Sequence, residues 1–244
     1  MRTLVRAAVA AVWTLLLVGC GDRGAPAEDG NGMTKLPAAT VLANSLTAFK
    51  AAPSYRVEIH SGGENGSPTT RITVIGTNCR GTVTRDGASS DVLKVGANYY
   101  IRPDEAFWST MLDKPTSAHA YTASTRGRWI KIDGSDDLLR RSGLKGAFAF
   151  ATRTALDGAV PQQVSLGERK DVGGVPTVTV LDSRTTSSNQ TQVSVATTGV
   201  PYPIRWDFGL GAVADFTNFG TTSDAMEQPA PADVVEMSAV LHSS

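Results

Sequence analysis

The chain has 244 residues, and its 23 lysines and arginines balance its 23 aspartates and glutamates. This balance, without a block of basic residues, argues against a nucleic-acid partner, because such a partner requires a clustered basic face. A chain of this length can form one large domain or two small ones.

The N-terminal residues combine a basic start, an apolar run and a cysteine. Arg2 and Arg6 precede the uncharged residues 7–18, and Gly19-Cys20 follows. A basic n-region, an apolar h-region of 7–15 residues and a small residue at the cleavage point define a secretory signal peptide. A transmembrane helix is the alternative, but it needs about 20 apolar residues. We therefore predict a signal peptide over residues 1–19.

The residues at the expected cleavage point, Leu17-Val18-Gly19-Cys20, resemble the lipobox of bacterial lipoproteins. The resemblance implies a diacylglyceryl group joined by a thioether to Cys20, and cleavage just before that residue. Two acyl chains hold a protein stably on a membrane, at about 0.8 kcal/mol per buried CH₂. We therefore expect a protein that is lipid-anchored through Cys20 to the extracytoplasmic face of the cell membrane.

A flexible tether is expected next. Residues 21–35 are rich in glycine, alanine and acidic residues and have no apolar period, so residues 20–37 are predicted to hold the folded part away from the membrane. Residues 38–244 are predicted to form a single domain. Its first element is an expected helix over 41–51, capped by Thr40 and ended by Pro53.

Strands dominate the rest of the first half. Tyr55, Val57 and Ile59 alternate with polar residues, which is the period of a half-buried strand. Turn residues recur at Asp86-Gly87 and at Gly96-Ala97-Asn98, as in an antiparallel meander. The expected strands are 55–60, 71–75, 81–84, 92–95, 99–102 and 129–132.

Helices interrupt these strands and then give way to a second meander. Residues 104–112 are expected to form a short helix, and residues 135–156 two helices broken near Gly143 and Gly146. The expected strands of the second half are 163–169, 175–182, 191–197, 203–208 and 212–216. Residues 229–231 are expected to interrupt regular structure.

This order of elements predicts an α+β fold. A large twisted antiparallel sheet with helices packed on one face accommodates both meanders and both helical segments. A Greek-key sandwich is the alternative, but the helices would then have no place between the sheets.

Several short segments together resemble the actinobacterial LppX/LprA/LprF/LprG lipoproteins, relatives of the LolA/LolB carriers. Besides the lipobox, the segments are Ser54-Tyr55-Arg56-Val57, Val95-Gly96-Ala97-Asn98-Tyr99-Tyr100, Arg128-Trp129-Ile130-Lys131-Ile132, Tyr202-Pro203-Ile204-Arg205-Trp206, Asp215-Phe216-Thr217-Asn218-Phe219-Gly220 and Pro231-Ala232-Asp233-Val234-Val235. The resemblance implies a LolA-like half-barrel with helices on its concave face, which binds or transfers a lipid or lipoglycan. The alternative is a sensor or scaffold lipoprotein that binds protein partners at the cell envelope.

A pocket for acyl chains requires apolar surface that ordinary core packing leaves unfilled. The alternative for each such residue is that it fills a solid core, as apolar residues usually do. The candidate lining residues are Val57, Ile59, Ile72, Val74, Ile101, Ile204 and Trp206 from the strands and Leu138, Leu139, Phe148 and Phe150 from the helical segment.

The sequence offers few residues in the arrangements that catalysis requires. Neither a Gly-Xaa-Ser-Xaa-Gly elbow nor a His-Glu-Xaa-Xaa-His motif occurs. Asp136-Asp137 lies at an expected helix start, where acidic side chains interact favourably with the helix dipole. Cys79 has no histidine at a spacing that suggests a catalytic pair, and the histidines do not suggest a metal site. We therefore predict a protein that is not an enzyme and has no cofactor or metal.

Overall fold

The computed structural model describes residues 30–62, 68–111, 117–133, 144–184, 189–222 and 225–242. The predicted signal peptide and Cys20 lie outside these ranges, as do Leu138 and Leu139. The first predicted helix after residue 135 falls there as well.

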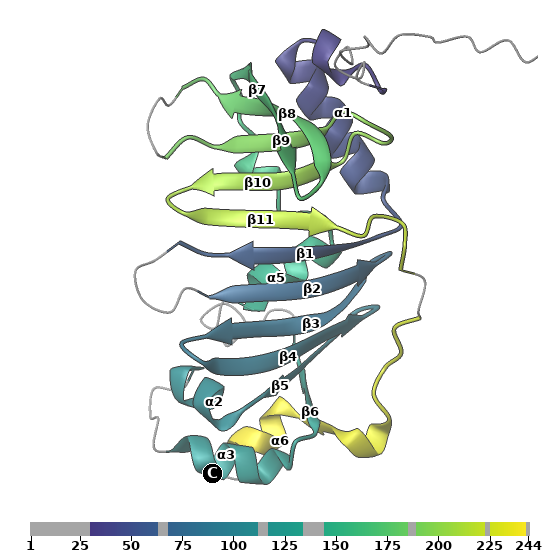
Figure 1. The fold of residues 1–244 in the computed structure, drawn as a ribbon. Coiled ribbons are helices and arrows are strands. Elements are labelled where there is room, and N and C mark those ends of the chain that lie inside the picture. The colour runs from purple at the N-terminus through teal and green to yellow at the C-terminus, as the bar shows by residue number, and fades with distance from the viewer. Residues whose placement is uncertain are drawn as a thin grey trace, which may run out of the picture.

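A single sheet of twelve strands dominates the fold (Figure 1). Its order is β12-β6-β5-β4-β3-β2-β1-β11-β10-β9-β8-β7, and every pair is antiparallel except β12 with β6. The strands are β1 (Ser54–His60), β2 (Thr69–Ile75), β3 (Asn78–Arg85), β4 (Ala88–Val95), β5 (Asn98–Pro103), β6 (Trp129–Ile132), β7 (Val164–Val172), β8 (Val175–Asp182), β9 (Gln192–Ala196), β10 (Pro203–Gly209), β11 (Ala212–Thr217) and β12 (Val234–Glu236). The predicted α+β class with one large antiparallel sheet is confirmed.

The strands fall into two meanders that meet in the middle of the sheet. The first runs from β1 to β6, and the second runs from β7 at the far edge back to β11. The meanders join where β1 pairs with β11, with Val57 opposite Phe216. The predicted turns at Asp86-Gly87 and Gly96-Ala97 connect β3 to β4 and β4 to β5.

Two helices cover one face of this sheet, which we call the inner face. Helix α1 (Ala38–Ala51) packs against β7 to β10, and α5 (Leu144–Ala151) packs against β2 to β4. Both reach Phe216 of β11, through Phe49 of α1 and Phe150 of α5. Figure 1 shows the sheet from its outer face, with α5 behind β1 and β2. The remaining helices are α2 (Glu105–Met111), α3 (Ala118–Thr125), α6 (Met237–His242) and the 3₁₀ turns η1 (Met33–Lys35), η3 (Asp157–Ala159) and η4 (Pro231–Asp233).

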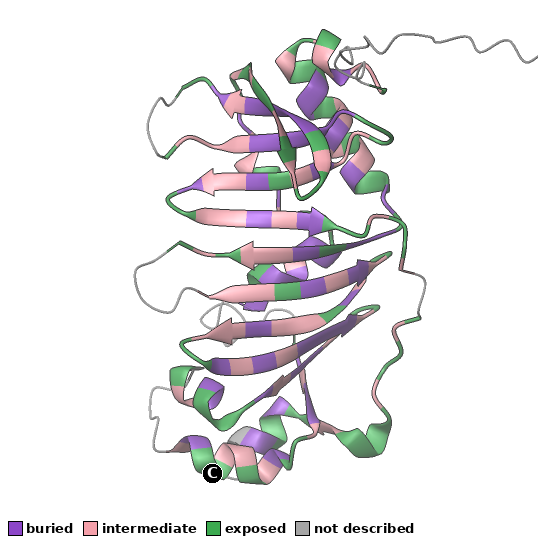
Figure 2. Ribbon diagram, in the orientation of Figure 1, coloured by how far each residue is buried: buried purple, intermediate pink, exposed green. Residues whose placement is uncertain are grey.

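Buried and exposed side chains alternate along the strands, and this alternation distinguishes the two faces of the sheet. In β1, Tyr55 and Val57 are fully buried on the inner face, whereas Arg56 and His60 are exposed on the outer face. Figure 2 shows this alternation along the strands. Burying a large apolar side chain contributes about 1.5–3 kcal/mol, so the apolar layer between the sheet and the helices stabilises the fold.

The start of α1 differs from the prediction. The helix begins at Ala38 with Pro37 as its N-cap and without a side-chain cap, so the expected cap at Thr40 is wrong. The amides of Thr40 and Val41 both donate to the Pro37 carbonyl, at 2.9 and 3.0 Å. A proline is well suited to a helix start because its fixed φ is already helical and it lacks an N–H group. Pro53 follows the end of the helix, as predicted.

Residues that precede α1 also contact the sheet. The Asn31 side chain donates to the carbonyls of Ala196 and Gly199, and Met33 is buried in the core. The last residues of the predicted tether are therefore fixed against the end of β9.

Candidate functional site

The inner face brings most of the predicted lining residues into one apolar cluster. Ile59 is half-buried against this cluster, and the other members are buried. Those other members are Val57, Ile72, Val74, Ile101, Phe148, Phe150 and Trp206. Among the described candidates the exception is Ile204.

Ile204 lies at an irregularity of β10. The register between β10 and β9 shifts between Pro203 and Arg205, so the simple alternation that placed Ile204 with Trp206 breaks there. Ile204 is half-buried and lines a hollow of about 510 Å³ together with Arg205 and Asp215. The opposite wall of this hollow is the turn between β7 and β8, at Val172 and Val175.

An aromatic cluster joins α1 and α5 to the sheet where β1 begins. The Phe49 and Tyr55 rings lie 5.0 Å apart, and both contact Phe216. The Tyr55 hydroxyl donates to the carbonyl of Phe150 at 2.6 Å. Burial strongly raises the pKa of Tyr55, so its hydroxyl stays protonated and remains a donor.

Arg153 contacts the aromatic cluster at the same end of the inner layer. Its guanidinium donates to the carbonyls of Phe49, at 2.7 Å, and Gly76, at 3.2 Å. It also lies over the Tyr55 ring, 5.2 Å from the ring centre. These contacts fix α1 and the β2–β3 turn relative to each other.

Four buried side-chain donors have no hydrogen-bond partner among the described residues, namely those of Ser45, Trp108, Thr179 and Trp206. Two of the four belong to elements that pack together where α1 covers the sheet. They are the Trp206 indole N–H and the Ser45 hydroxyl, which are 0% and 1% exposed. Ser45 lies on the buried stripe of α1 with Val41 and Phe49, and α1 packs against β10, which contains Trp206. A buried polar group without a partner costs about 1–3 kcal/mol, so this region is suited to an acceptor oxygen.

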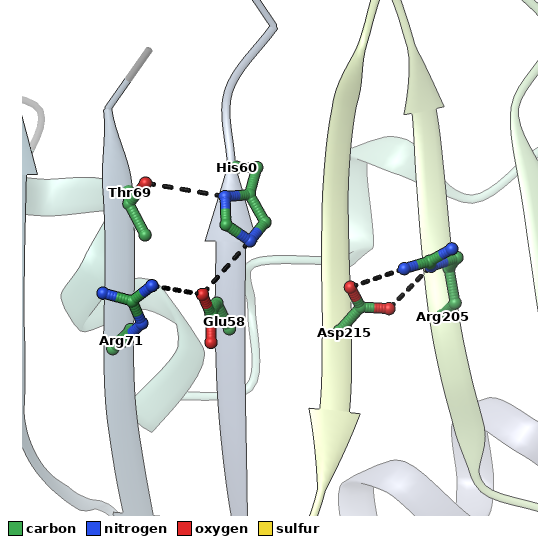
Figure 3. A network of polar contacts seen from close by, with 6 residues as sticks. All are labelled: Glu58, His60, Thr69, Arg71, Arg205 and Asp215. Carbon is green, nitrogen blue, oxygen red and sulfur yellow. Dashed lines mark hydrogen bonds and ion pairs between the residues drawn. The ribbon is translucent and has the colours of Figure 1, made fainter. Parts of the chain in front are cut away.

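Ion pairs between neighbouring strands tie the outer face together (Figure 3). Glu58 accepts from Arg71 at 2.7 Å and contacts His60 at 3.2 Å, while Asp215 accepts from Arg205 at 2.6 and 2.8 Å. The hydrogen bond from Arg71 lowers the pKa of Glu58. Such cross-strand pairs stabilise a sheet, so we assign this network a structural role.

A second hollow lies on the outer face beside the segment between β11 and β12. Figure 1 shows this segment running along one side of the sheet. We call this hollow, which has a volume of about 580 Å³, the outer groove. Its lining comes partly from the sheet and partly from the segment. The lining residues are Arg56, Thr73, Ile75, Arg80, Leu93 and Trp129 of the sheet and Thr222, Ala225, Met226, Glu227 and Pro229 of the segment. These residues were not predicted as a site, because they lie on the outward-facing phase of the strands and in an irregular segment.

Cys79 lies in the core and is fully buried. Burial raises the pKa of its thiol to about 12, so the thiolate needed for nucleophilic attack does not form near neutral pH. In the part of the chain that the structure describes, no three His, Cys, Asp or Glu side chains gather as a metal site would require. None of the described helices is long and apolar enough to cross a bilayer.

Two mycobacterial lipoproteins are among the solved structures that are similar to this chain. The lipoprotein LppX of Mycobacterium tuberculosis is 14% identical, with a TM-score of 0.43, and the match covers 76% of this chain and 98% of LppX. LprF from Mycobacterium bovis is 11% identical, with a TM-score of 0.46, and the match covers 78% of this chain and 96% of LprF. Both are among the lipoproteins that the sequence segments resemble. No family model and no curated protein matches the chain.

Proposed function

We propose that this protein is a lipoprotein that is anchored through Cys20 to the extracytoplasmic face of the cell membrane and binds or transfers a lipid or lipoglycan. The acyl chain of the ligand lies between the inner face of the sheet and helices α1 and α5. The observation on which the binding site rests is the pair of unpartnered donors, Ser45 and Trp206, within an otherwise apolar layer.

Lipid chemistry matches both properties of this layer. An acyl chain needs apolar walls, and the ester or hydroxyl oxygens at its head need a few well-placed donors. Ser45 and Trp206 are such donors, and Val41 and Phe49 flank Ser45 on the buried side of α1. Because α1 and α5 contact different strands and belong to neither meander, admitting a chain between a helix and the sheet loosens helix contacts, such as those of Arg153 and Tyr55, and leaves the hydrogen bonds of the sheet intact.

Native mass spectrometry of the full chain, extracted from bacterial membranes in mild detergent, tests the proposal. We expect a non-covalently bound lipid that dissociates on denaturation, whereas lipid on Cys20 stays attached. Replacing the two donors, in Ser45→Ala/Trp206→Phe, should reduce the bound fraction several-fold. The double variant should still fold, because the loss of two unpartnered polar groups offsets part of the packing lost with the larger indole ring.

Trp108→Phe is the matched control. The Trp108 indole N–H is also buried and unpartnered, but it lies on α2 and its ring stacks on Tyr121. Its replacement should leave lipid binding unchanged. Wild-type protein without bound lipid would contradict the proposal and favour the sensor or scaffold alternative.

A further inference from the structure

The floor of the outer groove is a single row of residues across four strands. Arg56 of β1 is paired with Thr73 of β2, Thr73 with Arg80 of β3, and Arg80 with Leu93 of β4. Because neighbouring strands lie about 4.8 Å apart, the two arginines stand roughly 10 Å apart with the Thr73 hydroxyl between them. The row therefore presents two cations and one hydroxyl on the same side of the sheet.

These two arginines differ from others on the outer face. Arg71 and Arg205 are paired with Glu58 and Asp215, whereas Arg56 and Arg80 make no ion pair or side-chain hydrogen bond with any described residue. Of the described residues that line the groove, Glu227 has the carboxylate. It forms no ion pair within 4 Å with a described residue, so the positive charge of the floor is not neutralised by contact.

The other half of the groove is apolar. Leu93 and Trp129 belong to a small hydrophobic cluster on the outer face, separate from the main core. Met226 and Pro229 line the opposite side of the same groove. Its volume, about 580 Å³, lies within the range of small-molecule sites. Cationic and apolar surfaces thus adjoin within one hollow.

We propose that the outer groove binds one anionic lipid by its phosphate. The phosphate accepts hydrogen bonds from the guanidinium groups of Arg56 and Arg80, whose planar forks match phosphate geometry, and from the Thr73 hydroxyl. The adjoining alkyl portion lies on the apolar side of the groove. Glu227 opposes the anion and weakens its binding. This site lies on the opposite face from the proposed inner site and does not depend on it.

Calorimetric titration of the full chain in phosphatidylcholine nanodiscs, with hexyl phosphate as the probe, tests this assignment. Arg56→Gln and Arg80→Gln should each weaken binding at least about tenfold, the loss expected when a hydrogen-bonded charge pair is removed. Glu227→Gln should strengthen binding. Arg71→Gln is the matched control, because it removes the same charge from the same face outside the groove, and it should leave the affinity unchanged.

Two further probes test the apolar half and the cationic half of the groove one at a time. Hexanol and inorganic phosphate should each bind at least about tenfold more weakly than hexyl phosphate. Inorganic phosphate binding as tightly as hexyl phosphate would show a site for a free anion and overturn the lipid assignment. The proposal also fails when hexyl phosphate does not bind, or when all three arginine variants weaken binding equally. The inner site is read out separately, by the Ser45 and Trp206 variants.

Discussion

Gly81 lies in the middle of β3, where it pairs with Ile72 of β2. A Cβ atom at this position would overlap the backbone carbonyl of Arg71 and lie 2.7 Å from the Cα of Ile72. Backbone atoms of a central strand cannot move aside without disturbing the ladder, so glycine is required here by a close approach of two strands.

Gly81→Ala should therefore destabilise the protein by about 1–3 kcal/mol, the usual cost of overpacking. The measurement is the free energy of unfolding in urea. Gly146→Ala is the control, because Gly146 lies in α5, has a negative φ and has nothing near its added Cβ. That change should stabilise by up to about 1 kcal/mol, and a similar effect from both substitutions would contradict the packing argument.

Tyr55 holds α5 against the sheet through one hydrogen bond. Tyr55→Phe keeps the ring and removes the hydrogen bond of 2.6 Å to the Phe150 carbonyl, which still accepts from the Arg153 amide at 3.0 Å. We therefore expect a loss of about 0.5–1.5 kcal/mol in the free energy of unfolding, the net contribution of one hydrogen bond. Tyr99→Phe is the control, since the Tyr99 hydroxyl makes no hydrogen bond with a described residue, and it should change stability little. Equal losses from the two variants would mean that the hydroxyl of Tyr55 does not act through this bond.

For individual helices and strands, the pattern of residue types predicted those elements that depend only on neighbouring residues in the chain. The alternation around Tyr55 and Val57 predicted β1, because a strand with one covered face shows a period of two. Ile204 was misplaced relative to Trp206 because a bulge in β10 breaks that period. Helix α3 and strand β12 were not predicted. β12 is defined by its pairing with β6, a distant segment of the chain, and the sequence around it has no strand period of its own.

The ion pair between Glu58 and Arg71 joins β1 to β2 on the outer face. Since the pKa of Glu58 is lowered in the folded state, the pair stabilises the fold above the ordinary pKa of glutamate and loses this contribution as pH falls through the lowered value. Both side chains are partly exposed, so Arg71→Gln should lower the free energy of unfolding only slightly near neutral pH. Urea denaturation should show this difference near pH 7 and not near pH 2. A loss of the same size at both pH values would mean that Arg71 contributes through packing.

At the scale of the whole molecule, both proposed sites depend on residues that the sheet brings together from distant segments. Arg56, Arg80 and Met226 meet in the outer groove, and Ser45 and Trp206 belong to α1 and β10, which pack together on the inner face. The sequence predicted an apolar inner layer, because residue type and period indicate burial. It did not predict the outer groove, because the register between strands and the path of residues 225–230 are not visible in any local pattern.

The position of this fold relative to the membrane depends on the segment before it. Asn31 is fixed to the end of β9 by its side chain, and an extended chain spans at most about 3.6 Å per residue. If Cys20 carries the proposed lipid, the segment from Cys20 to Asn31 can therefore hold the domain no more than roughly 40 Å from it. In Cys20→Ala the thioether cannot form, so we expect the protein to incorporate no labelled palmitate and to leave the membrane fraction. Cys79→Ala removes the other cysteine, which is buried in the core, and should leave labelling and membrane attachment unchanged. Labelled palmitate on Cys20→Ala, or an unlabelled wild-type chain that keeps its original N-terminus, would rule out the anchor.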